Sequence, residues 1–106
     1  MRRLICVVAL VVMPAQAQFY SGNELWQIMQ ADDYTSKGMA LGFVAGVSDS
    51  WDGTLICGPS SVTLGQAVDI VKRFLRDNPQ SRHLSAESLA RVALARAWPC
   101  RKGSGS

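Results

Sequence analysis

The chain has 106 residues, of which 48% are hydrophobic and 18% charged, and its formal net charge at pH 7 is +3. This length allows one domain with a modest core. Residues 18–57 hold five acidic side chains and one basic one, whereas residues 58–106 hold eight basic and three acidic ones. We interpret this asymmetry as solvated helix faces or as steering toward a charged partner. Basic and aromatic residues are not interleaved, which argues against a nucleic-acid-binding protein.

The first 17 residues have the pattern of a cleaved signal peptide. Met1-Arg2-Arg3 is basic, residues 4–13 are almost wholly apolar, and Ala15-Gln16-Ala17 fits the small-x-small cleavage rule. The apolar run is too short to span a bilayer, which needs ~20 residues. We therefore expect export to the periplasm, no membrane anchor after cleavage, and loss of Cys6 with the signal peptide.

The first helix is expected to start at Ser21, because Glu24 three residues later completes a capping box. Residues 31–33 should end it. The apolar side of this helix consists of Leu25, Trp26, Ile28 and Met29.

The second helix is predicted over residues 35–50, with an apolar stripe of helical period. The stripe consists of Ala40, Phe43, Val44, Val47 and Trp51. Gly38, Gly42 and Gly46 recur every four residues along one side of this helix. Each glycine costs up to ~1 kcal/mol relative to alanine in a helix. We therefore interpret the three glycines as a close-packing face, within the domain or between the protomers of a homodimer.

The third helix is predicted to start at Thr63, with Gln66 completing a second capping box, and to stop at Asn78-Pro79. Its expected inward residues are Leu64, Ala67, Val68, Val71, Phe74 and Leu75. The fourth helix should start near Ser85 and end at Trp98-Pro99. Its expected stripe is Leu89, Val92, Ala93 and Ala97.

No segment alternates over the length of a strand, so we expect an all-α domain of four to five helices over residues 18–101. We interpret residues 102–106 as a flexible tail or an expression remnant. Two cysteines remain after Cys6, and an even count in an oxidising compartment predicts a disulfide between Cys57 and Cys100. In the chain-entropy model, closing a loop of about 44 residues contributes about 4 kcal/mol.

Catalytic groups are sparse in this sequence. His83 is the single histidine, and we interpret it as a hydrogen-bonded loop residue near the start of the fourth helix. One histidine and two disulfide sulfurs are too few ligands for a metal site, and no G-x-S-x-G elbow is present. We therefore expect a binding protein, without enzymatic activity, cofactor or metal.

The predicted binding segment runs from Ser48 to Ile56, where the chain leaves the second helix. Its candidate contact residues are Ser48, Asp49, Ser50, Trp51, Asp52, Gly53 and Thr54. A tryptophan between acidic residues is a common interface anchor, and Gly53 permits a turn. The alternative is that Trp51 and Ile56 fill the core beneath the loop.

An ordered set of motifs covers the chain from Gly22 to Cys100 and resembles the Rap/Tai immunity family. The motifs are Gly42-Phe43-Val44-Ala45-Gly46-Val47-Ser48-Asp49, Cys57-Gly58-Pro59, Val62-Thr63-Leu64-Gly65-Gln66, Asn78-Pro79, Arg82-His83-Leu84 and Trp98-Pro99-Cys100.

The resemblance implies a helical, often dimeric, periplasmic protein that binds a type VI secretion peptidoglycan amidase and blocks its substrate cleft with a protruding loop. By analogy, residues 48–56 would be the inserted loop, and Cys57 and Cys100 match two family cysteines. Many family members look to have a further pair of cysteines, one in the first helix and one in the second. This chain has no cysteine at either place, near Trp26 or near Met39. Packing alone should therefore hold the first helix.

Two alternatives stay open. One is a periplasmic acid-stress chaperone, because the carboxylates of the N-terminal half would be neutralised below about pH 4. The other is an envelope binding protein without an amidase partner.

Overall fold

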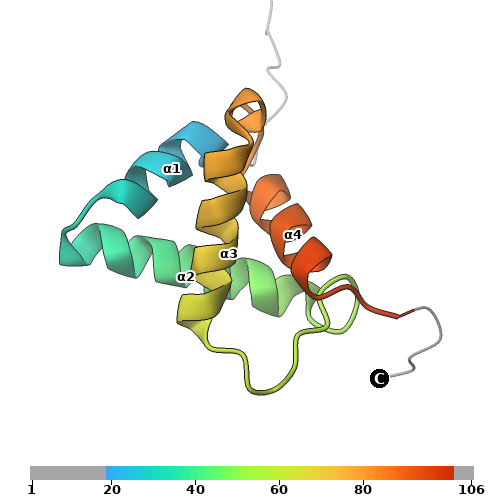
Figure 1. Ribbon diagram of the computed structural model, residues 1–106. Helices are drawn as coiled ribbons and strands as arrows, with labels where there is room; N and C mark the ends of the chain where they lie inside the picture. Colours follow the sequence, from blue (N-terminus) through green and yellow to red (C-terminus); the bar gives the residue numbers. More distant parts are fainter. Residues whose placement is uncertain (1–18, 102–106) are drawn as a thin grey trace, which may run out of the picture.

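The computed structural model describes residues 19–101, in which four α-helices and one short 3-10 helix follow one another (Figure 1). They are α1 (Gly22–Gln30), α2 (Tyr34–Trp51), α3 (Leu64–Asp77), η1 (Pro79–Ser81) and α4 (Ala86–Ala97). In this part of the chain, strand-like pairing is limited to isolated bridges. The all-α prediction is therefore confirmed. The predicted signal peptide and the tail at residues 102–106 lie outside the described residues.

Both predicted capping boxes are present. The Ser21 hydroxyl accepts a hydrogen bond from the Glu24 N–H at 3.2 Å, and the Glu24 carboxylate accepts one from the Ser21 N–H at 3.3 Å. Thr63 and Gln66 make the same reciprocal pair at 3.2 and 2.8 Å. These bonds satisfy N–H groups that a helix start leaves without intrahelical partners.

The second helix is longer than predicted at both ends. The Asp33 carboxylate accepts a hydrogen bond from the Ser36 N–H at 2.9 Å, so Asp33 is the N-cap and α2 begins at Tyr34. The helix continues through Trp51 and ends at Asp52. Ser48 to Trp51 therefore belong to the last turn of α2.

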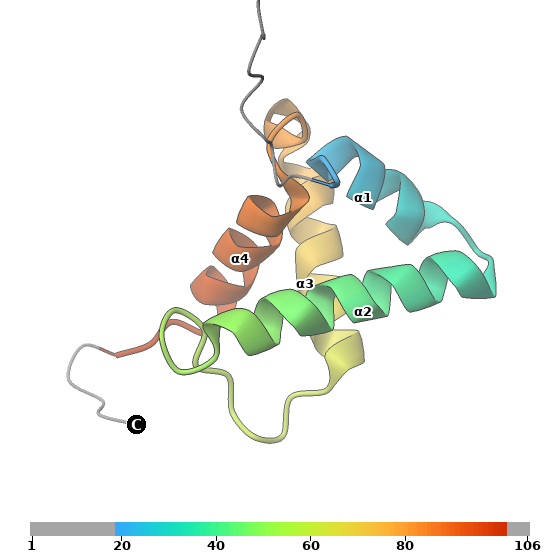
Figure 2. The ribbon, with the colours of Figure 1, turned by 180° about the vertical axis from the view of Figure 1, so that it is seen from behind.

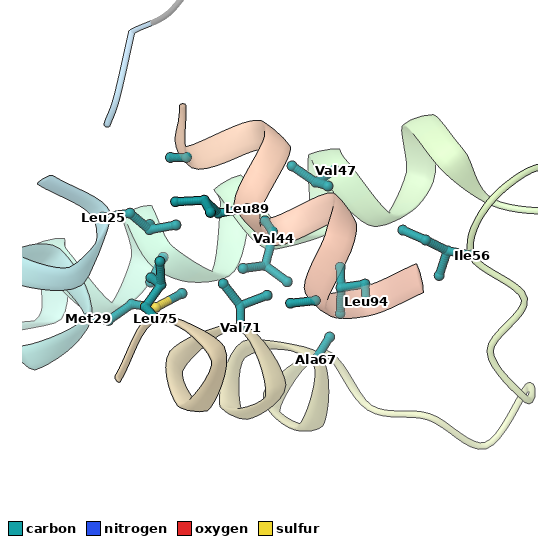
Figure 3. Packing of buried hydrophobic residues seen from close by; sticks show 14 residues of the cluster. Leu25, Met29, Val44, Val47, Ile56, Ala67, Val71, Leu75, Leu89 and Leu94 are labelled. Atoms are coloured by element: carbon teal, nitrogen blue, oxygen red, sulfur yellow. The ribbon is translucent and has the colours of Figure 1, made fainter. Parts of the chain in front are cut away.

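The helices pack so that α3 and α4 lie on one side of α2, and α1 lies beside the first half of α2 (Figures 1 and 2). Leu25, Val44, Val71, Leu75 and Leu94 are the largest fully buried side chains, and they meet between the four helices (Figure 3). Burying one such side chain contributes roughly 1.5–3 kcal/mol. This common core fixes the relative positions of the helices.

The apolar stripes were predicted correctly for α2 and only in part for α3 and α4. Ala67, Val71 and Leu75 are buried as expected, but Leu64 is exposed. On α4, Leu89 and Ala93 are buried, whereas Val92 and Ala97 are exposed and the prediction for them was wrong. The rest of the buried face of α4 consists of Ala86, Ala90 and Leu94.

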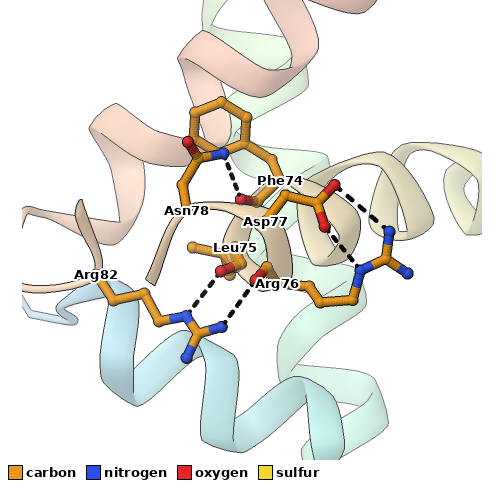
Figure 4. Close-up of polar contacts among 6 residues, drawn as sticks. All are labelled: Phe74, Leu75, Arg76, Asp77, Asn78 and Arg82. Atoms are coloured by element: carbon orange, nitrogen blue, oxygen red, sulfur yellow. Dashed lines mark hydrogen bonds and ion pairs between the residues drawn. The ribbon is translucent and has the colours of Figure 1, made fainter. Parts of the chain in front are cut away.

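Arg82 closes the C-terminal end of α3 (Figure 4). Its Nε donates to the Leu75 carbonyl at 2.7 Å and its Nη2 donates to the Arg76 carbonyl at 3.3 Å. Asn78 Nδ2 donates to the Phe74 carbonyl at 2.8 Å. Carbonyls that the end of a helix leaves free are thereby satisfied. The Arg82 guanidinium also lies 4.4 Å from the centre of the Trp26 ring, which joins α3 to α1.

The start of α1 docks on the connection between α3 and α4. The Gly22 N–H donates to the Leu84 carbonyl at 2.8 Å, and the Asn23 N–H donates to the Arg82 carbonyl at 2.7 Å. Gly22 is buried, and a Cβ there would lie 2.8 Å from the Arg82 carbonyl oxygen and would clash with the Leu89 side chain. The first helix is thus held by backbone hydrogen bonds as well as by packing.

The predicted disulfide is confirmed. Cys57 and Cys100 are joined, with their Cα atoms 4.9 Å apart. The Cys57 N–H also donates to the Trp98 carbonyl at 2.8 Å. The link ties the segment after α2 to the end of α4. Among residues 19–101, no helix has both the length and the apolar character needed to cross a membrane.

Candidate functional site

The predicted binding segment is divided between a helix end and a tight turn. Ser48 to Trp51 lie in α2, and the chain turns at Asp52 to Ile56. The Trp51 carbonyl accepts hydrogen bonds at 3.1 Å from the N–H groups of Thr54, Leu55 and Ile56. Gly53 has a φ of +78°, a conformation that favours glycine. This turn is therefore well defined by its own backbone.

Ile56 anchors the far end of the turn, because its side chain is only 4% exposed and belongs to the core. The Gly53 N–H donates to the Ile56 carbonyl at 3.0 Å. Asp52, Gly53, Thr54 and Leu55 are exposed. The turn thus presents these four residues to solvent from a fixed base, as a protruding element requires.

Trp51 connects α2 to α4. Its Nε1–H donates to Glu87 Oε1 at 2.9 Å, and the Arg91 guanidinium lies 4.9 Å from the centre of its ring. Arg91 Nε is also 3.3 Å from the same Glu87 oxygen. The side chain is half-buried. These contacts favour the packing interpretation of Trp51 over its interpretation as an interface anchor.

Asp49 and Asp52 carry the charge of this region. Both are exposed, and neither forms an ion pair with another of the described residues. They line a hollow of about 550 Å³ together with Ile56 and Trp98. Their carboxylates are available to cationic groups of a partner.

A second loop borders the same hollow. Residues 58–61 are exposed, and the Val62 N–H donates to the Pro59 carbonyl at 3.1 Å. Gly58, Pro59, Ser60 and Val62 line the hollow together with the two aspartates. Sequence reasoning missed this loop as part of the site, although Gly58-Pro59-Ser60-Ser61 is a run typical of an exposed turn. We call residues 52–63 the α2–α3 connection.

The disulfide and Trp98 hold the α2–α3 connection in place. Cys57 lies in its middle and is bound to Cys100. The Trp98 ring packs on Gly58, where an added Cβ would lie 3.4 Å from Trp98 Cδ2. The two exposed parts of the connection are therefore fixed on either side of one covalent anchor.

The row of three glycines on α2 does not pack within the described part of the chain. Gly38, Gly42 and Gly46 are exposed, and an ideal Cβ on any of them would have no neighbour within 4 Å. Figure 2 shows this helix in front of the others, with none of them covering its outer side. Of the two interpretations from sequence, packing inside the domain is thus excluded for the described residues, and a face between protomers stays a prediction.

The described residues bring no catalytic set together. His83 is exposed in the connection between α3 and α4, away from the carboxylates of the α2–α3 connection. Residues 19–101 contain no group of three or more histidine, cysteine, aspartate or glutamate side chains that could hold a metal ion. What the site offers is a fixed, protruding, partly acidic surface.

A family model described as Rap1a immunity proteins matches residues 21–100, which is about three quarters of the chain. The match begins at the N-cap of α1 and ends at the second disulfide cysteine. It therefore includes the whole α2–α3 connection. No curated protein matches this chain.

Proposed function

The chain belongs to the Rap1a immunity protein family, and from this premise we propose that it binds a type VI secretion peptidoglycan amidase in the periplasm and blocks its substrate cleft. The observation that carries the proposal is the α2–α3 connection, a protruding segment fixed by Ile56 and by the Cys57–Cys100 disulfide. Inhibition would be steric, without any chemical step by the immunity protein.

Rigidity is what makes this segment suitable for occlusion. Ordering a flexible loop on binding costs about 0.5–1.5 kcal/mol for each immobilised side chain. Here three hydrogen bonds to the Trp51 carbonyl hold the turn before any partner arrives. The cost of ordering the backbone of the turn is therefore met in folding, which favours tight and specific binding.

The exposed carboxylates favour a partner with cationic groups near its cleft. Asp49 and Asp52 both line the hollow, and no described cation neutralises them through an ion pair. Charges of this kind accelerate association and select the partner more than they add affinity. We infer that the cognate amidase places lysine or arginine side chains around its cleft.

We further propose that the protein forms a homodimer through α2. Gly38, Gly42 and Gly46 form an exposed row without side chains, so a second helix could approach closely. Met39 is exposed on the same helix and would be buried by that contact. Light scattering should give twice the chain mass, and Gly42→Arg should give a monomer of unchanged helicity. A wild-type protein that is monomeric at micromolar concentration would refute this dimer.

The acid-stress chaperone gains no support from the described residues. Asp32, Asp33, Asp49, Asp52 and Glu24 are all exposed. Neutralising exposed carboxylates lowers the stability of a fold only slightly, because exposed ion pairs contribute little to it. A large acid-driven exposure of the core is therefore not expected from these groups.

The proposal is tested with amidase effectors encoded beside this gene. Calorimetric titration should show binding, and hydrolysis of a peptidoglycan fragment should fall in proportion to the immunity protein added. In the matched variant, two glycines replace residues Asp52–Leu55. This variant retains the core and the disulfide, so it tests the exposed turn alone. Absence of binding to any neighbouring effector, together with unchanged resistance after gene deletion, would overturn the proposal.

A further inference from the structure

A groove of about 320 Å³ lies where α1, the first half of α2 and the start of α3 meet. None of the residues that line this groove belongs to the α2–α3 connection or lines the hollow beside it. Its walls are mainly apolar and are formed by Ile28, Met29, Ala40, Leu41 and Val68. This volume lies at the lower end of small-molecule sites, which span roughly 300–1,000 Å³.

The polar groups around the groove are mostly cationic. Lys37 and Lys72 line it together with one acidic residue, Asp69. Lys37 forms an ion pair with Asp32 at 3.1 Å, but the Asp32 side chain is 99% exposed. A solvated pair of this kind contributes little and is exchanged easily for another anion.

The positive charge continues along α3 beyond the groove. A neighbouring hollow of about 290 Å³ shares Asp69 and Lys72 with the groove and adds Arg73 and Arg76. The other end of the groove reaches Gly65 in the first turn of α3, where the helix dipole also favours negative charge. An anion at the rim is thus favoured from both directions along this helix.

Because its walls are helical, the groove favours a hydrocarbon chain over an extended peptide. All nine lining residues belong to helices, whose backbone groups are largely occupied in their own hydrogen bonds. An extended peptide buried here would leave its N–H and C=O groups without partners, which costs about 1–3 kcal/mol for each group. An unbranched hydrocarbon chain has no such groups and needs only apolar contact.

We propose that this groove binds a fatty-acid anion, with its acyl chain among the five apolar side chains and its carboxylate at Lys37 and Lys72. Binding at this site does not depend on the proposed inhibition of an amidase, because the two surfaces share no lining residue. The site could be present whether or not an effector binds elsewhere.

The direct test is calorimetric titration of the disulfide-bonded protein with dodecanoate below its micelle concentration. The expected result is saturable binding of one molecule per chain. Dodecyltrimethylammonium has the same chain with the opposite charge and should bind at least about tenfold more weakly, because the rim is cationic. Butyrate, with the same headgroup and a short chain, should not bind measurably. Equal binding of the cationic and anionic probes would overturn the proposal.

Matched variants locate the site. Lys72→Glu should weaken dodecanoate binding about tenfold. Arg96→Glu, with the same charge change on α4 and outside both the groove and the neighbouring hollow, should leave the affinity within about twofold. If both changes weaken binding equally, the effect is general electrostatics and the groove is not the site.

Gly65→Leu tests the apolar part of the groove without disturbing the core. A Cβ at Gly65 would meet only Thr63 Oγ1, at 3.9 Å, so the larger side chain has space to project over the groove. The variant should melt at or above the wild-type temperature, because leucine is a better helix former than glycine, and should lose dodecanoate binding. Wild-type affinity in Gly65→Leu would show that the acyl chain lies elsewhere and would reject the site.

Discussion

Trp51 and Glu87 are joined by a hydrogen bond of 2.9 Å between the indole Nε1–H and the carboxylate Oε1, although they are 36 residues apart in sequence. Arg91 completes the contact from the other side, with its guanidinium over the indole ring. Because Trp51 is the last residue of α2, this contact fixes the point from which the α2–α3 connection starts.

Removing the indole donor should weaken the fold. Trp51→Phe keeps a ring beneath Arg91 but loses the hydrogen bond to Glu87, so we expect the free energy of unfolding to fall by about 1–2 kcal/mol. Glu87→Gln keeps an acceptor for the indole and should cost less. Urea denaturation of both variants measures the difference. An equal loss in the two variants would show that the hydrogen bond is not the main contribution.

Gly22 is the position where the fold has no room for a side chain. Gly22→Ala places a methyl group against the Arg82 carbonyl and the Leu89 side chain, and we expect a loss of about 1–3 kcal/mol in unfolding free energy. Gly65→Ala is the matched control, because its Cβ would make only an ordinary contact of 3.9 Å with Thr63 Oγ1 and alanine is the better helix former by up to ~1 kcal/mol. Thermal melting of the two variants should therefore shift in opposite directions.

Local signals in the sequence were sufficient to predict where the helices start, but not which face of α4 is buried. Ser21 with Glu24 and Thr63 with Gln66 are neighbours in sequence, so their hydrogen bonds could be predicted. In α4, alanines and other apolar residues occur on nearly every side. The helical period then fits more than one face, and the contact with α2 and α3 decides that Leu94 is buried and Val92 exposed.

The local structure of the candidate site could be predicted only in outline, for the same reason. The turn at Gly53 and the disulfide follow from residue types, but the contact of Trp51 with Glu87 depends on how α2 and α4 meet. The extension of α2 by one residue at each end was missed, because the exact ends of a helix depend on capping and on contacts such as that of Trp51 with Glu87.

The disulfide should be a large part of the stability. Cys57→Ser with Cys100→Ser should lower the free energy of unfolding by about 3–4 kcal/mol, since the bridge closes a long loop. Denaturant titration with and without reductant measures this loss in the wild type. The double variant is its own control and should be insensitive to reductant. Equal stability of the reduced and oxidised proteins would contradict the prediction.

Asp33 should make stability depend on pH in the acidic range. The Ser36 backbone N–H, and secondarily the Ser36 side chain, stabilise the carboxylate and hold the pKa of Asp33 below its ordinary value of 3.8. A lowered pKa in the folded state contributes stability above pH 3.8, and this is lost as pH falls through the folded-state pKa. Asn caps a helix as well as Asp does but does not titrate. Asp33→Asn should therefore match the wild type at pH 7 and lose less stability below pH 4, as followed by urea midpoints. An unchanged slope would refute this role.

The two exposed aspartates should govern how fast an amidase is captured. In Asp49→Lys with Asp52→Lys, we expect the association rate constant to fall by about ten- to a hundredfold at low salt, because the steering attraction becomes repulsion. The difference should shrink as salt is raised, since the Debye length is only ≈ 8 Å at 0.15 M ionic strength.

Asp69→Lys with Asp77→Lys is the matched control, because it makes the same charge change on α3, among residues that line neither the connection nor its hollow. Stopped-flow or surface-based kinetics with the cognate amidase would measure the rates. Equal slowing in both double variants would mean that net charge alone controls the encounter and that Asp49 and Asp52 do not face the partner.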